Sequence, residues 1–132
     1  MITPWFPVPK STTSGIFVLR VAQALSVRHN VKVIHLDSLP GVHERAGDDT
    51  IGGVAVHRVL FTRLRLGDWS RARAAVRLAA RHVDIVHSHA LTGILPFASR
   101  RPAGRTPWVH TEHWSGLTSP ETLTGVGASR DA

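Results

Sequence analysis

Short apolar segments alternate with helical segments along most of this chain, and no other feature of the sequence restricts the fold as strongly. Runs rich in β-branched residues at 31–36 and 54–59 predict strands, and shorter runs at 84–87 and 107–111 predict two more. Ile2-Thr3, which precedes a proline-rich stretch, reads as the end of a further strand. Because alternating strands and helices form right-handed crossovers, we expect one Rossmann-like, doubly wound α/β domain with a mostly parallel sheet.

Helical periodicity appears in three segments, which span residues 16–28, 71–82 and 91–98. Ser14 is the predicted N-cap of the first helix, and Asp68 or Ser70 that of the second. The second helix has a predicted buried stripe of alanines and one valine. Residues 40–53 are polar and glycine-rich and predict a loop, whereas residues 114–132 show no periodicity.

The length and composition fit a single globular domain. With 132 residues, 42% hydrophobic and 19% charged, we expect one domain over residues 1–120 and an irregular tail over 121–132. The chain has no cysteine, which excludes disulfide frameworks and thiolate metal sites and fits a reducing compartment, so we expect a cytoplasmic protein. No run approaches the ~20 apolar residues that a membrane-spanning helix needs.

The net charge of +7 comes almost entirely from arginine. A basic excess can attract nucleic acid, anionic lipid or phosphorylated substrates. The interleaved aromatic and basic residues of nucleic-acid-binding proteins are absent from the sequence, so we expect no nucleic-acid partner. Arg73, Arg77 and Arg81 form a basic row on the second helix. This row is either a solvated face or a peripheral contact with an anionic membrane.

Three separated segments are candidates for one site: residues 7–15, 87–89 and 111–114. Each follows or ends a predicted strand, and doubly wound sheets bind ligands beyond the carboxyl ends of their strands. In the first segment, free N–H groups at a helix start favour an anion, and Gly15 permits close approach of a phosphate. The alternative is a strand-to-helix turn that simply requires a small residue.

The histidines of the other two segments have several interpretations. His87 and His89 share one face of an extended chain, so both side chains can point into a cleft. The alternative is that one of them packs in the core and the other is solvated. They could form half of a metal site, but no supporting ligand follows, and we expect no metal. His110 and His113 are three residues apart, whereas a zinc helix motif needs four. His113 is the better candidate for substrate contact, and His110 for a structural role.

At these residues the chain resembles the amino-terminal domain of glycosyltransferase family 4, enzymes with the GT-B fold. The resemblance rests on four pieces that occur in order: TPWFP with the later GIFV, AQALSVRHNVKVIHL, DIVHSH and PWVHTEHWSG. It covers residues 1 to about 120 and implies retaining transfer of a sugar from a nucleotide-sugar to an acceptor. It assigns Ser14, Gly15 and Ile16 to the donor phosphates and His113 to the catalytic position. It places four further residues in the acceptor cleft: His87, His89, Glu112 and Trp114.

The resemblance also implies what this chain would need for activity. Its partners would be a nucleotide-sugar and a sugar or lipid-linked acceptor, with no other cofactor. The first strand is short relative to the family pattern, and the donor-binding carboxyl-terminal domain is missing, so a separate carboxyl-half chain is an expected partner. A lipid-linked acceptor would place the protein at the inner face of the cell membrane. The alternatives are a non-catalytic module that binds a glycan, a phosphorylated ligand or a partner, and a truncated gene product without function.

Overall fold

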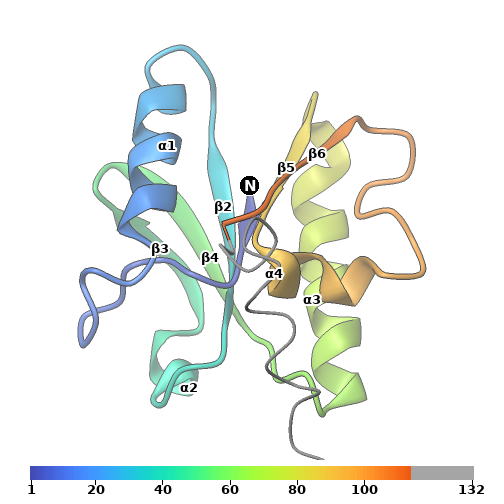
Figure 1. The fold of residues 1–132 in the computed structure, drawn as a ribbon, viewed down its shortest axis with the longest axis horizontal. Coiled ribbons are helices and arrows are strands. Elements are labelled where there is room, and N and C mark those ends of the chain that lie inside the picture. Colours follow the sequence, from blue (N-terminus) through green and yellow to red (C-terminus); the bar gives the residue numbers. More distant parts are fainter. Residues whose placement is uncertain (114–132) are drawn as a thin grey trace, which may run out of the picture.

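In the computed structural model, residues 1–113 are described, and they form one six-stranded sheet. The strands are β1 (Ile2–Thr3), β2 (Lys32–Asp37), β3 (Gly47–Ile51), β4 (Val54–Leu60), β5 (Val86–His89) and β6 (Trp108–Thr111). Their order across the sheet is β3-β4-β2-β1-β5-β6, and only the β3–β4 pair is antiparallel. The predicted doubly wound, mostly parallel α/β architecture is therefore confirmed (Figure 1).

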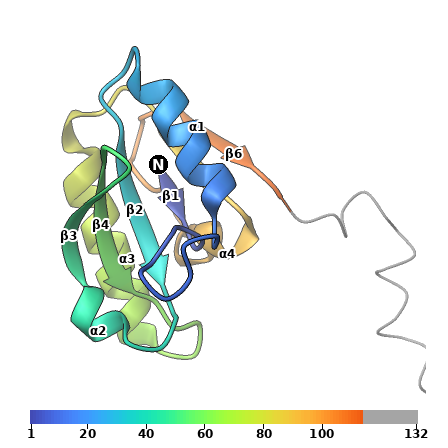
Figure 2. The same ribbon diagram turned by 90° about the vertical axis from the view of Figure 1, so that its left-hand side faces the viewer.

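Helices cover both faces of the sheet. They are α1 (Ile16–Ser26), α2 (Val42–Arg45), α3 (Leu66–Ala79) and α4 (Leu91–Ile94), with short 3-10 turns η1 (Ala80–His82) and η2 (Leu95–Phe97). Helix α1 lies against one face and α3 against the opposite face (Figure 2). Among residues 1–113, none of these helices combines the length and the hydropathy required to span a bilayer.

Two apolar clusters form the core, one on each face of the sheet. Strand β2 contributes to both, because successive side chains of a strand point to opposite faces. Val33 packs with Val18 and Ala22 of α1, whereas Ile34 packs with Val76 of α3. The predicted buried stripe of the second helix is confirmed: Ala72 and Val76 are buried and Ala75 and Ala79 partly so.

The prediction of a loop over residues 40–53 is wrong. This segment contains α2 and strand β3, which pairs with β4. Gly52 and Gly53, with φ of 55° and 81°, join the two strands. Positive φ at both central residues is the geometry of a tight two-residue hairpin. The Gly-Gly pair was the sequence signal for this hairpin, but the polar side chains of β3, an exposed edge strand, hid the strand pattern.

Both predicted helix caps are also wrong. The N-cap of α1 is Gly15, not Ser14, and it makes no side-chain capping bond. Helix α3 begins at Leu66, about a turn before the predicted start, and its N-cap is Arg65. Asp68 therefore lies inside the first turn, where its carboxylate accepts a hydrogen bond from the backbone N–H of Thr62 (2.9 Å).

Candidate functional site

The carboxyl ends of β1, β5 and β6 lie side by side at one edge of the sheet (Figure 1). Ile2 pairs with Ser88, and Ser88 with His110, in parallel register. Strand β5 extends to His89, so the His-Ser-His segment ends this strand, whereas the sequence predicted that it follows the strand. The parallel register brings residues separated by more than 20 positions to the same edge.

Three of the predicted site histidines form one cluster at this edge. The rings of His87 and His89 are 4.1 Å apart between centroids. His89 Nδ1 lies 3.0 Å from His113 Nε2, and these two rings are parallel within 6°. His87 Nε2 is 2.7 Å from the hydroxyl of Thr111. His89 is buried, His87 half-buried and His113 exposed, so the cluster leads from the core to the surface.

The first turn of α1 reaches the same cluster through aromatic contacts. The ring of Phe17 lies 4.5 Å from that of His113, and Trp5 packs edge-on against Phe17 at 6.1 Å. Both aromatic side chains are more than a third exposed, at 38% for Trp5 and 39% for Phe17. The sequence did not mark either residue as part of the site, because Phe17 is one of the apolar residues that give the helical period of residues 16–28 and Trp5 lies in a proline-rich stretch.

Gly15 is buried and adopts a left-handed conformation, with φ of 63°. A Cβ atom at this position would lie 2.3 Å from the carbonyl carbon and oxygen of Trp5. The backbone of the loop therefore occupies the space next to Gly15, and this contact by itself explains why a glycine is needed. Of its neighbours, Ser14 is half-buried and Ile16 is exposed at the start of α1.

Trp108 and His110 of β6 face the other side of the strand from Thr111. His110 Nδ1 lies 2.9 Å from Ser88 Oγ, which also accepts a hydrogen bond from the indole of Trp108 (2.8 Å). Glu112 has one carboxylate oxygen 3.5 Å from His110 Nε2, and the other accepts the backbone N–H of His113. Glu112 thus contacts both histidines of the segment. Trp114 lies outside the described residues.

The buried environment keeps the inner histidines uncharged. Burial, together with the neighbouring His87 and His113, lowers the pKa of His89 to about 4. Burial also lowers the pKa of His87. At neutral pH both rings are therefore neutral and act as hydrogen-bond donors and acceptors. No group of three or more His, Asp or Glu side chains within residues 1–113 is arranged to hold a metal ion.

Ala90, directly after His89, has a strained backbone, with φ of 58° and ψ of 149°. Only glycine adopts this region readily, and an alanine there costs about 1–3 kcal/mol. The N–H of Ala90 donates to the carbonyl of Thr111 (3.0 Å), which ties the strained residue to β6. Such strain is often found beside functional groups, since the surrounding structure must hold it in place.

A set of buried charged residues lies beneath the loop that joins β1 to α1. Arg58 donates to the carbonyl of Pro7 (3.2 Å) and pairs with Asp49. Asp37, fully buried at the end of β2, pairs with Arg45 of α2 at 2.8 Å. His35 is buried beside them, and burial is the main reason that its pKa lies at about 4. Among these residues, Arg58 contacts the loop directly through Pro7.

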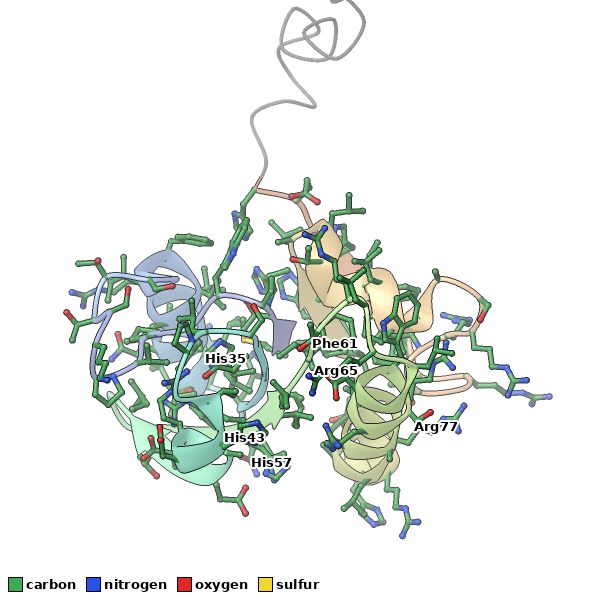
Figure 3. The ribbon with its side chains drawn as sticks, turned by 90° about the horizontal axis from the view of Figure 1, so that it is seen from below. His35, His43, His57, Phe61, Arg65 and Arg77 are labelled. Atoms are coloured by element: carbon green, nitrogen blue, oxygen red, sulfur yellow. The ribbon has the colours of Figure 1, made fainter. Side chains whose placement is uncertain are left out.

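Two cavities open on the described part of the chain. The larger, of about 1010 Å³, lies at the amino ends of the strands and is lined by Lys32 and Asp84, among others. The smaller, of about 570 Å³, lies between α2, β4 and α3, where His43 and His57 lie close together (Figure 3). Of the histidine cluster, His87 lines the larger cavity, whereas His89 and His113 line neither of the two. The candidate site opens to the surface as a rim of the sheet, because His113, Trp5 and Phe17 are exposed.

Comparison with known protein families identifies the family of the chain. Neither the curated proteins nor the solved structures contain a match to it. A model of glycosyltransferase family 4 matches residues 14–129, which include Gly15 and the histidine cluster. Because the match extends over most of the sequence and agrees with the Rossmann-like sheet, the chain belongs to glycosyltransferase family 4.

Proposed function

We propose that this chain is the amino-terminal, acceptor-side domain of a retaining glycosyltransferase that uses a nucleotide-sugar as donor. The observation that carries the proposal is the convergence of α1, β5 and β6, where His113 contacts both His89 and Phe17. An open rim of this kind is suited to one wall of a cleft, and a second, donor-binding domain would supply the other wall.

His113 is the proposed catalytic residue beside the transferred sugar, and His89 positions it. His89 Nε2 is buried and has no hydrogen-bond partner among residues 1–113. Unpaired buried N–H groups are rarer than unpaired acceptors, so we assign the His89 proton to Nδ1, from which it donates to His113 Nε2. His113 then carries its own proton on Nδ1 and can donate it to a sugar or phosphate oxygen.

Ser14, Gly15 and Ile16 form the proposed contact with the donor diphosphate. They precede or begin α1, whose amino terminus carries a partial positive charge. Cleavage of the donor builds negative charge on the departing diphosphate, and fixed dipoles at that position lower the barrier. His87 and Glu112 are the proposed acceptor contacts, together with Trp114, and the acceptor is a sugar or a lipid-linked sugar.

Reconstitution with a donor-binding domain tests the proposal. The chain alone should show no transfer from any nucleotide-sugar, and transfer should appear when a family 4 carboxyl-terminal domain is added. His113→Ala should then lower the transfer rate by about 100-fold, the size expected for loss of a positioned proton donor, with little change in stability. The control is His29→Ala, an exposed histidine after α1.

Other outcomes would contradict the proposal. Robust turnover by the 132-residue chain alone would show that no second domain is required. If His113→Ala left activity unchanged and lowered the melting temperature, His113 would be a packing residue. Thermal stabilisation by sugars, with no transfer under any pairing, would instead favour a non-catalytic glycan-binding module.

A further inference from the structure

The segment between β4 and α3 exposes two leucines to an unusual degree. Leu64 is 94% and Leu66 82% exposed, the highest values among the large apolar side chains of the described residues. One exposed leucine needs no explanation, because much of any protein surface is apolar. Two leucines presented outward by the same short segment form a small apolar projection.

The backbone of this segment is fixed by hydrogen bonds. The N–H of Thr62 donates to Asp68 (2.9 Å), and the indole of Trp69 donates to the carbonyl of Arg63 (3.0 Å). The N–H of Arg65 donates to the carbonyl of Thr62 (3.1 Å). The leucines are therefore held outward by a defined turn. Binding through them costs little conformational entropy, since the backbone is already ordered.

The charges around the leucines have one sign. Arg63 and Arg65 alternate with the leucines, and Arg77 and Arg81 continue the exposed face of α3 and η1 (Figure 3 labels Arg65 and Arg77). Asp68 is the only acidic residue between positions 63 and 82, and it is buried and paired with Arg71. The exposed face of this segment thus carries several arginines and no exposed carboxylate.

Arg73 does not belong to this face, which corrects the basic row predicted from the sequence. Its guanidinium donates to the carbonyl of Pro96 and lies 6.0 Å from the centre of the Trp69 ring. These contacts turn Arg73 toward the fold. The solvated row consists of Arg77 and Arg81, which the loop residues Arg63 and Arg65 extend toward the carboxyl edge of the sheet.

We propose that Arg63–Leu66, together with Arg77 of α3 and Arg81 of η1, forms a docking surface for an anionic lipid bilayer. The arginines would bind lipid phosphates while Leu64 and Leu66 enter the headgroup region, the combination by which interfacial proteins bind membranes. The phosphates of a nucleic acid would also pair with the arginines, but a nucleic acid offers no apolar environment for the leucines. The loop follows β4 at the carboxyl edge of the sheet, which is also the edge that bears the histidine cluster.

Vesicle flotation with the whole 132-residue chain tests this surface independently of sugar transfer. We expect binding to phosphatidylcholine vesicles that contain about 30% phosphatidylglycerol, weaker binding at about 0.5 M salt, and none to pure phosphatidylcholine. The double variant Leu64→Ser/Leu66→Ser should weaken the partition constant about ten-fold or more. Arg63→Gln/Arg65→Gln should weaken it about 25-fold, at about five-fold for each arginine.

Matched controls lie on the opposite face of the sheet. Val27→Ser removes an apolar side chain that is 81% exposed. Arg20→Gln/Arg28→Gln removes two exposed arginines, one within α1 and one just after it. Both controls should bind vesicles like the unchanged chain. Normal binding by the leucine variant, with loss only in the arginine variant, would reject membrane insertion and assign the surface to a polyanion such as RNA. Absence of binding to anionic vesicles would also overturn the proposal.

Discussion

At the scale of single residues, the turn before α1 depends on Gly15. Two effects oppose a side chain there: the left-handed backbone and the carbonyl of Trp5, only 2.3 Å from a Cβ. We expect Gly15→Ala to lower the free energy of unfolding by about 3 kcal/mol, through backbone strain and overpacking together. Gly104→Ala is the control. It has φ of 57° and open space around it, so strain alone should cost about 1 kcal/mol.

Urea denaturation of the two variants separates these effects. Equal losses of stability would show that the Trp5 backbone moves aside without cost, and that the small size of Gly15 serves a ligand instead. This experiment therefore decides between the two interpretations of Gly15 that the sequence left open.

Ala90 offers a prediction of opposite sign. Replacement by glycine should relieve its strained backbone, at φ of 58°, and raise the free energy of unfolding by about 1 kcal/mol after the entropic cost of glycine. Ala24→Gly, on the exposed side of α1, should lower it by about 1 kcal/mol. Thermal denaturation of both variants measures the difference. A loss of stability in Ala90→Gly would show that the backbone there is not strained.

At the scale of secondary-structure elements, an ion pair ties α2 to the sheet. Arg45 of α2 donates from Nε and Nη2 to Asp37, whose side chain is fully buried at the end of β2. Arg45→Met would leave that carboxylate buried without its cation, which should cost about 3 kcal/mol. Arg20→Met, on the exposed face of α1, should change stability by less than about 0.5 kcal/mol.

Chemical denaturation of Arg45→Met and Arg20→Met tests the role of this pair. A loss of less than about 1 kcal/mol in Arg45→Met, which is the cost of losing a surface ion pair, would mean that water reaches Asp37 readily. The double variant Arg45→Met/Asp37→Leu should recover part of the lost stability, because it removes the uncompensated charge.

At the scale of the whole molecule, two buried histidines make stability depend on pH. The pKa of each of His35 and His89 is about 4 in the folded chain, below the ordinary value of 6.5. Between these values the unfolded chain binds protons that the folded chain does not. Stability should therefore fall as the pH drops from 6.5 toward 4, by up to about 3 kcal/mol for each of these two histidines.

Urea midpoints measured between about pH 7.5 and 4.5 test this dependence. The lowered pKa values of Asp48, Asp49 and Asp68 affect stability only below their ordinary value of 3.8, outside this range. His35→Gln and His89→Gln should each reduce the slope, and the double variant should keep only the smaller dependence that comes from the lowered pKa values of His87 and the Met1 amino group. An unchanged slope in the double variant would mean that other groups control the acid sensitivity.

Local patterns along the chain were sufficient to predict most of the architecture. The strand period in residues 31–36 and the helical period in residues 16–28 depend only on neighbouring side chains, so they were readable without a structure. The carboxyl-edge rule then predicted that segments containing Gly15, His89 and His113 lie at one edge. The sequence did not predict the edge strand β3, because an exposed strand has no buried face and therefore shows no alternation of apolar residues.

The sequence by itself determined which elements form and at which edge of the sheet the candidate residues lie, because periodicity and strand direction are local properties. Only the tertiary structure decided their contacts. The Trp5 carbonyl beside Gly15, the His89–His113 hydrogen bond and the exposure of Leu64 each depend on how distant segments pack. Packing brings together residues that no short-range pattern connects, and it also leaves some apolar side chains uncovered.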